Sequence, residues 1–319
     1  MKNINSKLKK KISVAVGIPA YNAEKNIGRL LQSILEQNQR TCVLKKITVY
    51  SDKSSDRTVK ILEKIKKRNL LVIDAKRRRG FAYALKYLLY QNKEDIVILL
   101  NDDIIINDAK FIEKTIKPFR KENNLGLVSS NPQPILRNNF IERAVVSGFI
   151  AYDKMRHILN NGSNVFTCDG KTLTLSKEFI KSIRFPKKLN EMGNVDEYLY
   201  FTCLKNGFKY SHVEDARVLF KPPSTVKDFV KWMTRNQSNK HILHKHFGEL
   251  IEKEYKLPKK IYLAFTYFRL LELLKNPVGG IMIYVLGVYA SFQARRSAKK
   301  NFKLTWDVVS TTKELNYLD

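Results

Sequence analysis

The first third of the chain alternates short apolar strands with amphipathic helices four times, and this alternation constrains the fold more than any other feature. The runs Ile12–Ile18 and Ile96–Leu100 are aliphatic and have the length of buried strands. Between them, residues 26–37 carry apolar side chains at helical spacing. Such alternation predicts an α/β fold with a mostly parallel sheet and helices on both faces. Ligands of such sheets bind at the carboxyl ends of the strands.

Polar residues follow three of the predicted strands at that edge. Asn22 and Glu24 follow the first strand, Asp52 follows another, and Asn101, Asp102 and Asp103 come directly after a buried strand. Carboxylate and amide oxygens suit a hard divalent cation shared with substrate phosphates, which would neutralise a leaving diphosphate. Asp52 can accept the imide N–H of uracil or another base edge. Each motif taken alone also suits a turn or a helix cap.

The rest of the chain is less regular until about residue 250. Short strands are expected at 126–130, 172–175 and 216–219, with a helix over 196–205 that Gly207 closes. Beyond residue 250, the stretch 276–294 contains no charged residue and has nearly the length that spans a bilayer.

This apolar stretch has three interpretations. It can form a buried helix pair, one transmembrane helix over 277–294, or a membrane-associated helical hairpin over 257–296 that turns at 276–280. We favour the hairpin because basic clusters at 253–260 and 295–303 flank both ends, which the positive-inside rule places on the cytoplasmic face. Trp306 is a candidate interfacial anchor.

Charge and cysteine content restrict the partners and the compartment. The 319 residues include 59 Lys and Arg against 30 Asp and Glu, a formal net charge of +29, which favours an anionic partner such as an acidic membrane or phosphate-bearing substrates. Cys42, Cys168 and Cys203 are far apart and form no CxxC pair, which indicates a reducing compartment. Residues 1–20 do not resemble a signal peptide.

Taken together, the order and spacing of these motifs over about residues 12–240 resemble the family 2 glycosyltransferases with a GT-A fold. Ile18–Asn22, with Glu24, resembles the family's opening nucleotide-binding turn. Ser51–Thr58 resembles the family's Asp-Asp-Gly-Ser-Thr-Asp-x-Thr stretch, and Asn101–Asp103 resembles its metal-binding DXD motif. The donor-binding residues that this resemblance implies are Pro19, Ala20, Tyr21, Asn22, Glu24, Asp52, Arg79, Gly80, Asn101, Asp102 and Arg235, with Asp103 as the metal ligand. Ser51 and Asn101 depart from the family pattern, because Asp is usual at both positions.

The acceptor side resembles the family less completely. Asp169-Gly170 resembles its acceptor-side Gly segment, and Asp196-Glu197 its general-base motif. Asp196 is favoured as the base by its spacing from Gly207, with Glu197 in reserve. Arg235 fits the Arg of the QxxRW motif, but Trp232 and Asn236 replace its Gln and Trp, which argues against a processive polymerase.

The resemblance implies an inverting transferase that uses a nucleotide-sugar donor, UDP rather than GDP, and Mg²⁺ or Mn²⁺. The expected acceptor is a lipid-linked saccharide, a polyprenyl phosphate or a cell-surface glycan precursor. An ionised lipid phosphate would need no general base. The expected organisation is a basic tail (1–11), a donor-binding half (12–115), an acceptor-binding half (116–250) and a membrane-associated region (251–319).

Two other functions were weighed against this one. A nucleotidyltransferase also uses a parallel sheet and paired Asp, but it should carry a Gly-rich basic phosphate loop after the first strand, where this chain has Pro-Ala-Tyr-Asn. A non-enzymatic polyanion-binding protein would explain the charge alone, but the sequence has no recognisable nucleic-acid-binding motif, so we expect no nucleic-acid partner.

Overall fold

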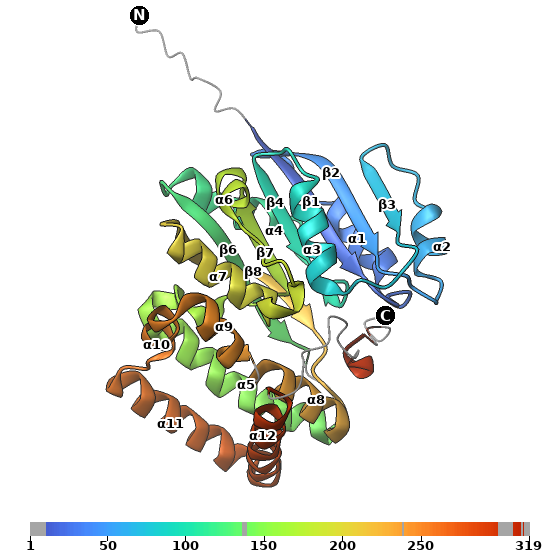
Figure 1. Ribbon diagram of the computed structural model, residues 1–319. Helices are drawn as coiled ribbons and strands as arrows, with labels where there is room; N and C mark the ends of the chain where they lie inside the picture. Colours follow the sequence, from blue (N-terminus) through green and yellow to red (C-terminus); the bar gives the residue numbers. More distant parts are fainter. Residues whose placement is uncertain (1–10, 136–138, 238, 299–308, 314, 316–319) are drawn as a thin grey trace, which may run out of the picture.

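The computed structural model describes residues 11–135, 139–237, 239–298, 309–313 and 315 (Figure 1). Across the described residues, one sheet has the strand order β3-β2-β1-β4-β7-β6-β8-β5. Its strands are β1 (Ile12–Ala20), β2 (Cys42–Ser51), β3 (Leu70–Asp74), β4 (Ile96–Leu100), β5 (Ile104–Ile105), β6 (Leu125–Pro134), β7 (Thr172–Ser176) and β8 (Lys209–Phe220).

The first four strands confirm the predicted alternation. They pair in parallel in the order β3-β2-β1-β4, and helices α1 (Ile27–Leu35), α2 (Thr58–Glu63) and α3 (Phe81–Tyr90) connect them. Every second residue of β1 belongs to one apolar core, which includes α1, while Ala15 belongs to the core on the opposite face, which includes α3. Helices therefore cover both faces, and the carboxyl ends of β1, β2 and β4 meet at one edge.

The second half of the sheet is mixed rather than parallel. Strand β7 runs antiparallel to both β4 and β6, β8 runs parallel to β6, and the short β5 runs antiparallel to β8. The three expected strands are present here as the longer β6, β7 and β8. β5 comes directly after Asp103 and pairs with β8 at the far edge of the sheet from β3.

Helices surround this second half. They are α4 (Phe111–Ile116), α5 (Phe140–Ile158), α6 (Lys177–Ser182), α7 (Val195–Lys205), α8 (Val226–Gln237), α9 (Asn239–Phe247) and α10 (Glu249–Tyr255), with 3₁₀ turns at 117–120, 159–162, 165–167 and 189–192. A further 3₁₀ turn spans 310–313. Helix α7 confirms the predicted helix, and Gly207 follows it with a φ of +78° that favours glycine.

Two apolar helices, α11 (Lys259–Lys275) and α12 (Pro277–Ala298), follow. Only Asn276 separates them, so the break is shorter than the expected turn at 276–280, because Pro277 suits the first position of a helix and residues 277–280 form the first turn of α12. They pack against α5 and α8, at the end of the molecule away from α1 and α2 (Figure 1). Many large apolar side chains of both helices are about half exposed or more: Tyr262, Leu263, Tyr267, Leu270, Leu274, Val278, Ile281, Tyr284, Val285, Val288, Tyr289 and Phe292. A fully buried helix pair is therefore not what the structure contains.

By length and composition alone, Pro277–Arg296 is a helix that could cross a membrane. Trp306, most of the basic segment 295–303 and the tail 1–10 lie outside the described residues.

Candidate active site

A cleft of about 1630 Å³ opens at the carboxyl edge of the sheet and continues to α5, α8, α11 and α12. Most of the predicted site residues line it: Pro19, Ala20, Tyr21, Asp52, Gly80, Asn101, Asp102, Asp103, Asp196, Glu197 and Arg235. Asn22, Glu24 and Arg79 do not line it. The side chains of Asn22 and Glu24 and the backbone of Arg79 instead hold the loops around it.

The turn after β1 is tied to the loop after β2. Asn22 has a left-handed φ of +48°, and its Oδ1 accepts a 2.8 Å hydrogen bond from the amide of Ser55. Glu24 Oε2 accepts hydrogen bonds from the amide and Nε of Arg57, at 3.0 and 3.1 Å. These contacts hold the two polar loops together, so Asn22 and Glu24 support the cleft without lining it.

Asp52 holds the loop before α3. Its two carboxylate oxygens accept hydrogen bonds from the amides of Arg79 (2.7 Å) and Gly80 (2.8 Å). Gly80 has a φ of +90°, which glycine adopts without strain. Asp52 is 5% exposed and still lines the cleft. Beside it, the guanidinium of Arg78 lies 3.8 Å from the centroid of the Tyr21 ring.

The acidic turn after β4 is anchored from two sides. The buried Asn26 donates hydrogen bonds of 2.8 Å from Nδ2 to the carbonyls of Asp102 and Ile104. Oδ2 of Asp102 accepts a 2.9 Å hydrogen bond from the amide of Tyr21. No local pattern predicts this role of Asn26, because the role depends on the backbone path of a turn distant in the sequence.

The surroundings of the Asp103 carboxylate suit a metal ion. Its Oδ1 is buried and has no hydrogen-bond partner among the residues that the structure describes. Burial raises the pKa of this carboxyl, and the neighbouring Asp102 raises it further, while Lys313, Lys171 and Arg235 oppose the shift. An unpartnered buried carboxylate oxygen fits a divalent cation.

Few protein side chains are available to such a cation, because the described part of the chain has no group of three or more His, Cys, Asp or Glu placed to hold a metal. That matches Mg²⁺, which one or two carboxylates and substrate phosphates commonly hold.

The candidate base lies at the start of α7. Oδ2 of Asp196 accepts a 3.0 Å hydrogen bond from the amide of Gly170. Burial raises the pKa of Asp196 to about 6, and the charge of Asp169 adds to the increase. Burial also disfavours ionised Asp169, but Lys171 and Arg156 outweigh it and hold the pKa of that carboxyl low. A carboxylate poised near pH 6 beside one that stays ionised is suited to proton transfer.

Glu197 is engaged differently. Its carboxylate forms a hydrogen bond with the hydroxyl of Tyr255, which contributes, after burial and the charge of Glu197, to the raised pKa of that tyrosine. Glu197 is therefore held by another side chain, whereas the Asp196 carboxylate accepts a hydrogen bond from the backbone amide of Gly170.

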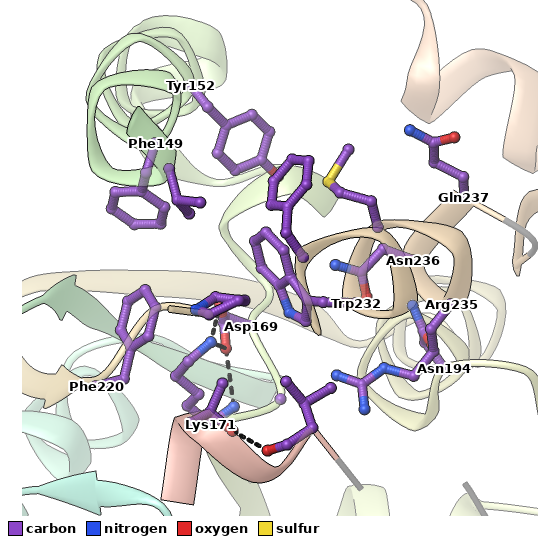
Figure 2. Close-up of a pocket in the computed structure, with 18 of the residues that line it drawn as sticks. Phe149, Tyr152, Asp169, Lys171, Asn194, Phe220, Trp232, Arg235, Asn236 and Gln237 are labelled. Carbon is purple, nitrogen blue, oxygen red and sulfur yellow. Dashed lines mark hydrogen bonds and ion pairs between the residues drawn. The ribbon is translucent and has the colours of Figure 1, made fainter. Parts of the chain in front are cut away.

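The cleft changes from polar to apolar along its length. Figure 2 shows the ion pair of Asp169 and Lys171 on one side and the rings of Phe149 and Tyr152 on the other. Arg235 projects from α8 into the polar part, where burial lowers the pKa of its guanidinium and Asp103, Asp196 and Asp169 oppose that shift. The apolar part is lined by side chains of α5, α8, α11 and α12, among them Val145, Phe149, Tyr152, Trp232, Phe265, Leu270, Leu273, Ile281, Ile283 and Tyr284.

Lys171 and Lys313 line the cleft and were not predicted. Lys171 Nζ lies 3.3 Å from Asp169 and 4.2 Å from the centroid of the Phe220 ring. Lys313 Nζ lies 2.8 Å from Asp102 Oδ2, although the two residues are far apart in the sequence. A single lysine carries no local pattern that predicts such a contact.

Comparison with known sequences decides the family. Residues 15–184, more than half of the chain, match the family model described as glycosyl transferase family 2. The chain belongs to this family. Membership places the chain among the sugar-transferring enzymes and confirms the resemblance drawn from the motifs. It disfavours both the nucleotidyltransferase and the non-enzymatic polyanion-binding protein.

Curated relatives match over shorter stretches. The poly-beta-1,6-N-acetyl-D-glucosamine synthase of Staphylococcus aureus (strain COL) is 30% identical over 161 residues, which is 47% of this chain and 37% of the relative. The 4,4'-diaponeurosporenoate glycosyltransferase of Staphylococcus haemolyticus is 28% identical over 128 residues, covering 39% and 33%. The matched region thus spans about a third of the length of these relatives.

Solved structures share the fold. A mannosyltransferase from Pyrobaculum calidifontis, solved with GDP-Man and Mn²⁺, gives a TM-score of 0.56 at 17% identity and covers 98% of this chain and 89% of its own. A glucosyl-3-phosphoglycerate synthase from Mycobacterium tuberculosis, solved with Mn²⁺, UDP and phosphoglyceric acid, gives 0.54 at 16% identity and covers 74% and 79%. The expected GT-A architecture is confirmed.

Proposed function

We propose that the chain transfers a sugar, with inversion, from a nucleotide-sugar donor to an acceptor that carries an apolar chain. One observation carries the proposal: the buried, unpartnered oxygen of Asp103 and the carboxylate of Asp196, with its pKa near 6, line the same cleft. The first suits a cation at a leaving diphosphate, and the second suits a base for an acceptor hydroxyl.

On the donor side, Pro19–Tyr21 and Asp52 hold the nucleoside, with UDP favoured over GDP. Asp103 and Asp102 hold Mg²⁺ or Mn²⁺, which when bound neutralises the diphosphate as it leaves. Arg235 adds a fixed positive charge in the same part of the cleft, where little water screens it.

On the acceptor side, the hydroxyl oxygen attacks the anomeric carbon while the bond from that carbon to the diphosphate oxygen breaks. The nucleoside diphosphate leaves with the bonding electrons, and Asp196 takes the hydroxyl proton. Glu197, held by Tyr255, remains the reserve base. A phosphate acceptor is already ionised and would need no base.

The apolar part of the cleft supports an acceptor such as a polyprenyl phosphate or a lipid-linked saccharide. The same two helices, α11 and α12, line the cleft with Leu273 and Ile283 and expose other apolar side chains outward. Exposed lysines and arginines at both ends of this pair, such as Lys259 and Arg295, suit an anionic membrane surface on the cytoplasmic side.

The test combines donor and acceptor panels. Purified protein is incubated with UDP- and GDP-sugars and Mn²⁺, together with either polyprenyl phosphate or a soluble sugar, and the anomeric configuration of the product is read by NMR. The proposal expects one donor to dominate, a lipid product and an inverted anomer. A retained anomer would overturn the mechanism, and exclusive transfer to the soluble sugar would overturn the lipid acceptor.

A further inference from the structure

The C-terminal segment 309–315 returns from the apolar helices to the donor end of the sheet. Figure 1 shows its dark red 3₁₀ turn beside the donor half, far along the chain from the strands that it approaches. Val309 and Leu315 are buried, at 6% and 0% exposed. The described part of this segment is thus packed onto the donor half.

Specific hydrogen bonds hold the segment on both sides of the cleft. The amide and hydroxyl of Thr311 donate to Oδ2 of Asp228 at 3.0 and 2.7 Å, which ties the segment to α8. Arg29 of α1 donates from Nη2 to the carbonyl of Leu315 at 2.6 Å. Lys313 lies between Thr311 and Leu315 in the sequence, so these contacts restrict its position.

Lys313 lies where the donor's phosphates are expected. Its ammonium donates to Oδ2 of Asp102 at 2.8 Å and to the carbonyl of Tyr21, and its side chain is 20% exposed and lines the cleft. Both acceptors belong to the proposed nucleotide-binding turns. An ammonium has three N–H donors, and two of them have acceptors among the described residues.

The charges of the site call for a cation here. Asp102 and Asp103 already place two carboxylates at this turn, and the diphosphate of a nucleotide sugar adds two further negative charges. A divalent cation and the guanidinium of Arg235 together balance only part of that charge in a poorly solvated cleft. Asp102 is also held by the amide of Tyr21, so it keeps its place when Lys313 turns its third N–H toward a phosphate.

We propose that Lys313 is a ligand of the donor's diphosphate, carried into the site by the C-terminal segment 309–315. This inference rests on the proposed function, because it assumes a nucleoside diphosphate in the cleft. It makes the end of the chain part of the donor site, although the motifs of that site lie within the first third of the sequence.

Calorimetric titration with nucleotides tests the inference without turnover. UDP, GDP, UMP and uridine are titrated, with and without Mn²⁺, into the full chain and into Lys313→Met and Lys313→Arg, with Lys64→Met as an exposed lysine control distant from the cleft. We expect Lys313→Met to weaken diphosphate binding about 10- to 100-fold, the range for a hydrogen bond to a charged group. UMP should lose less affinity, uridine none, and Lys313→Arg should recover part of the loss.

A second variant separates this role from a structural one. Thr311→Val loosens the segment but keeps the lysine, so it should weaken diphosphate binding less than Lys313→Met while lowering the melting temperature as much or more. Unchanged or tighter diphosphate binding by Lys313→Met overturns the inference and leaves the proposed function standing. Failure of the unaltered chain to bind any nucleoside diphosphate overturns both.

Discussion

The amide of Gly170 donates a 3.0 Å hydrogen bond to the carboxylate of Asp196, and the carboxyl of Asp169, the residue before Gly170, raises the pKa of Asp196. One short segment therefore both fixes the direction of the candidate base and adjusts its proton affinity. The hydrogen bond favours the ionised form, whereas burial and the like charge oppose it and together outweigh it. The resulting pKa of about 6 leaves Asp196 mostly ionised at neutral pH.

The pH dependence of turnover should follow Asp196. The rate constant kcat with a hydroxyl acceptor should fall on the acid side with an apparent pKa of about 6, because the protonated carboxyl accepts no proton. Asp169→Asn should move that limb to lower pH, since it removes a like charge. The measurement is a kcat profile from pH 4.5 to 8.5, with the exposed Lys64→Met as a control that should leave the limb in place. A flat profile would contradict Asp196 as the base.

Stability should respond to Asp196 in the opposite sense from activity. The pKa in the folded protein lies above the ordinary value of 3.8, so the ionised carboxyl destabilises the fold increasingly as pH rises from about 4 through 6. Asp196→Asn should therefore melt at a higher temperature than the parent at pH 7.5, with the difference shrinking toward pH 4. Thermal unfolding at three pH values checks this. A lower melting temperature at pH 7.5 would show that the ionised form supports the fold.

Gly170 should tolerate no larger residue without loss of turnover. A Cβ at this position would lie 3.2 Å from Oδ2 and 3.3 Å from Cγ of Asp196, so the carboxylate must move. Gly170→Ala should lower kcat about 10- to 100-fold through this displacement, with the donor KM nearly unchanged. Gly28→Ala, whose Cβ would lie 3.3 Å from Ile61 on the far side of the sheet, is the matched control. Loss of donor binding in Gly170→Ala would place the segment on the donor side instead.

The exposed face of α12 should mediate binding to anionic membranes. Val278, Val285 and Phe292 are 68%, 58% and 51% exposed and do not line the cleft. Their replacement by serine should reduce co-sedimentation with phosphatidylglycerol vesicles at least tenfold, because apolar burial at the interface is lost. Val226→Ser on α8, also exposed, serves as a control for general effects of surface serine. Undiminished co-sedimentation of the triple variant would exclude this face as the membrane contact.

Local patterns were sufficient to predict the donor half. Strand β1 and helix α1 follow directly from apolar periodicity, and Asp52 and Asp102 follow from their positions after strands. The mixed second half of the sheet was not predictable in the same way, because the antiparallel pairing of β7 with β4 depends on contacts between segments distant in the sequence. Periodicity also gives the existence of α11 and α12 but not the face that each buries.

Contacts with distant partners account for the site residues that the sequence did not predict. Lys313 is ordinary in its local sequence and gains a role only because Thr311 and Leu315 fix the segment beside Asp102. The converse holds for Asn22 and Glu24, whose motif positions were recognised but whose side chains bind the loop of Ser55 and Arg57 rather than face the cleft. Motifs identify the turns of such a site, whereas side-chain direction depends on the packed fold.

The central claim, that Asp103 serves the donor and Asp196 the acceptor, is tested most directly by comparing binding with turnover in matched variants. Affinity for the preferred nucleotide sugar is measured with Mn²⁺ and with EDTA in the parent, Asp103→Asn and Asp196→Asn, alongside kcat with acceptor. The account predicts that EDTA and Asp103→Asn each abolish metal-dependent donor binding. It also predicts that Asp196→Asn binds donor like the parent but loses turnover about 100- to 10,000-fold with a hydroxyl acceptor. Donor binding that needs neither metal nor Asp103, or full turnover by Asp196→Asn with that acceptor, would contradict it.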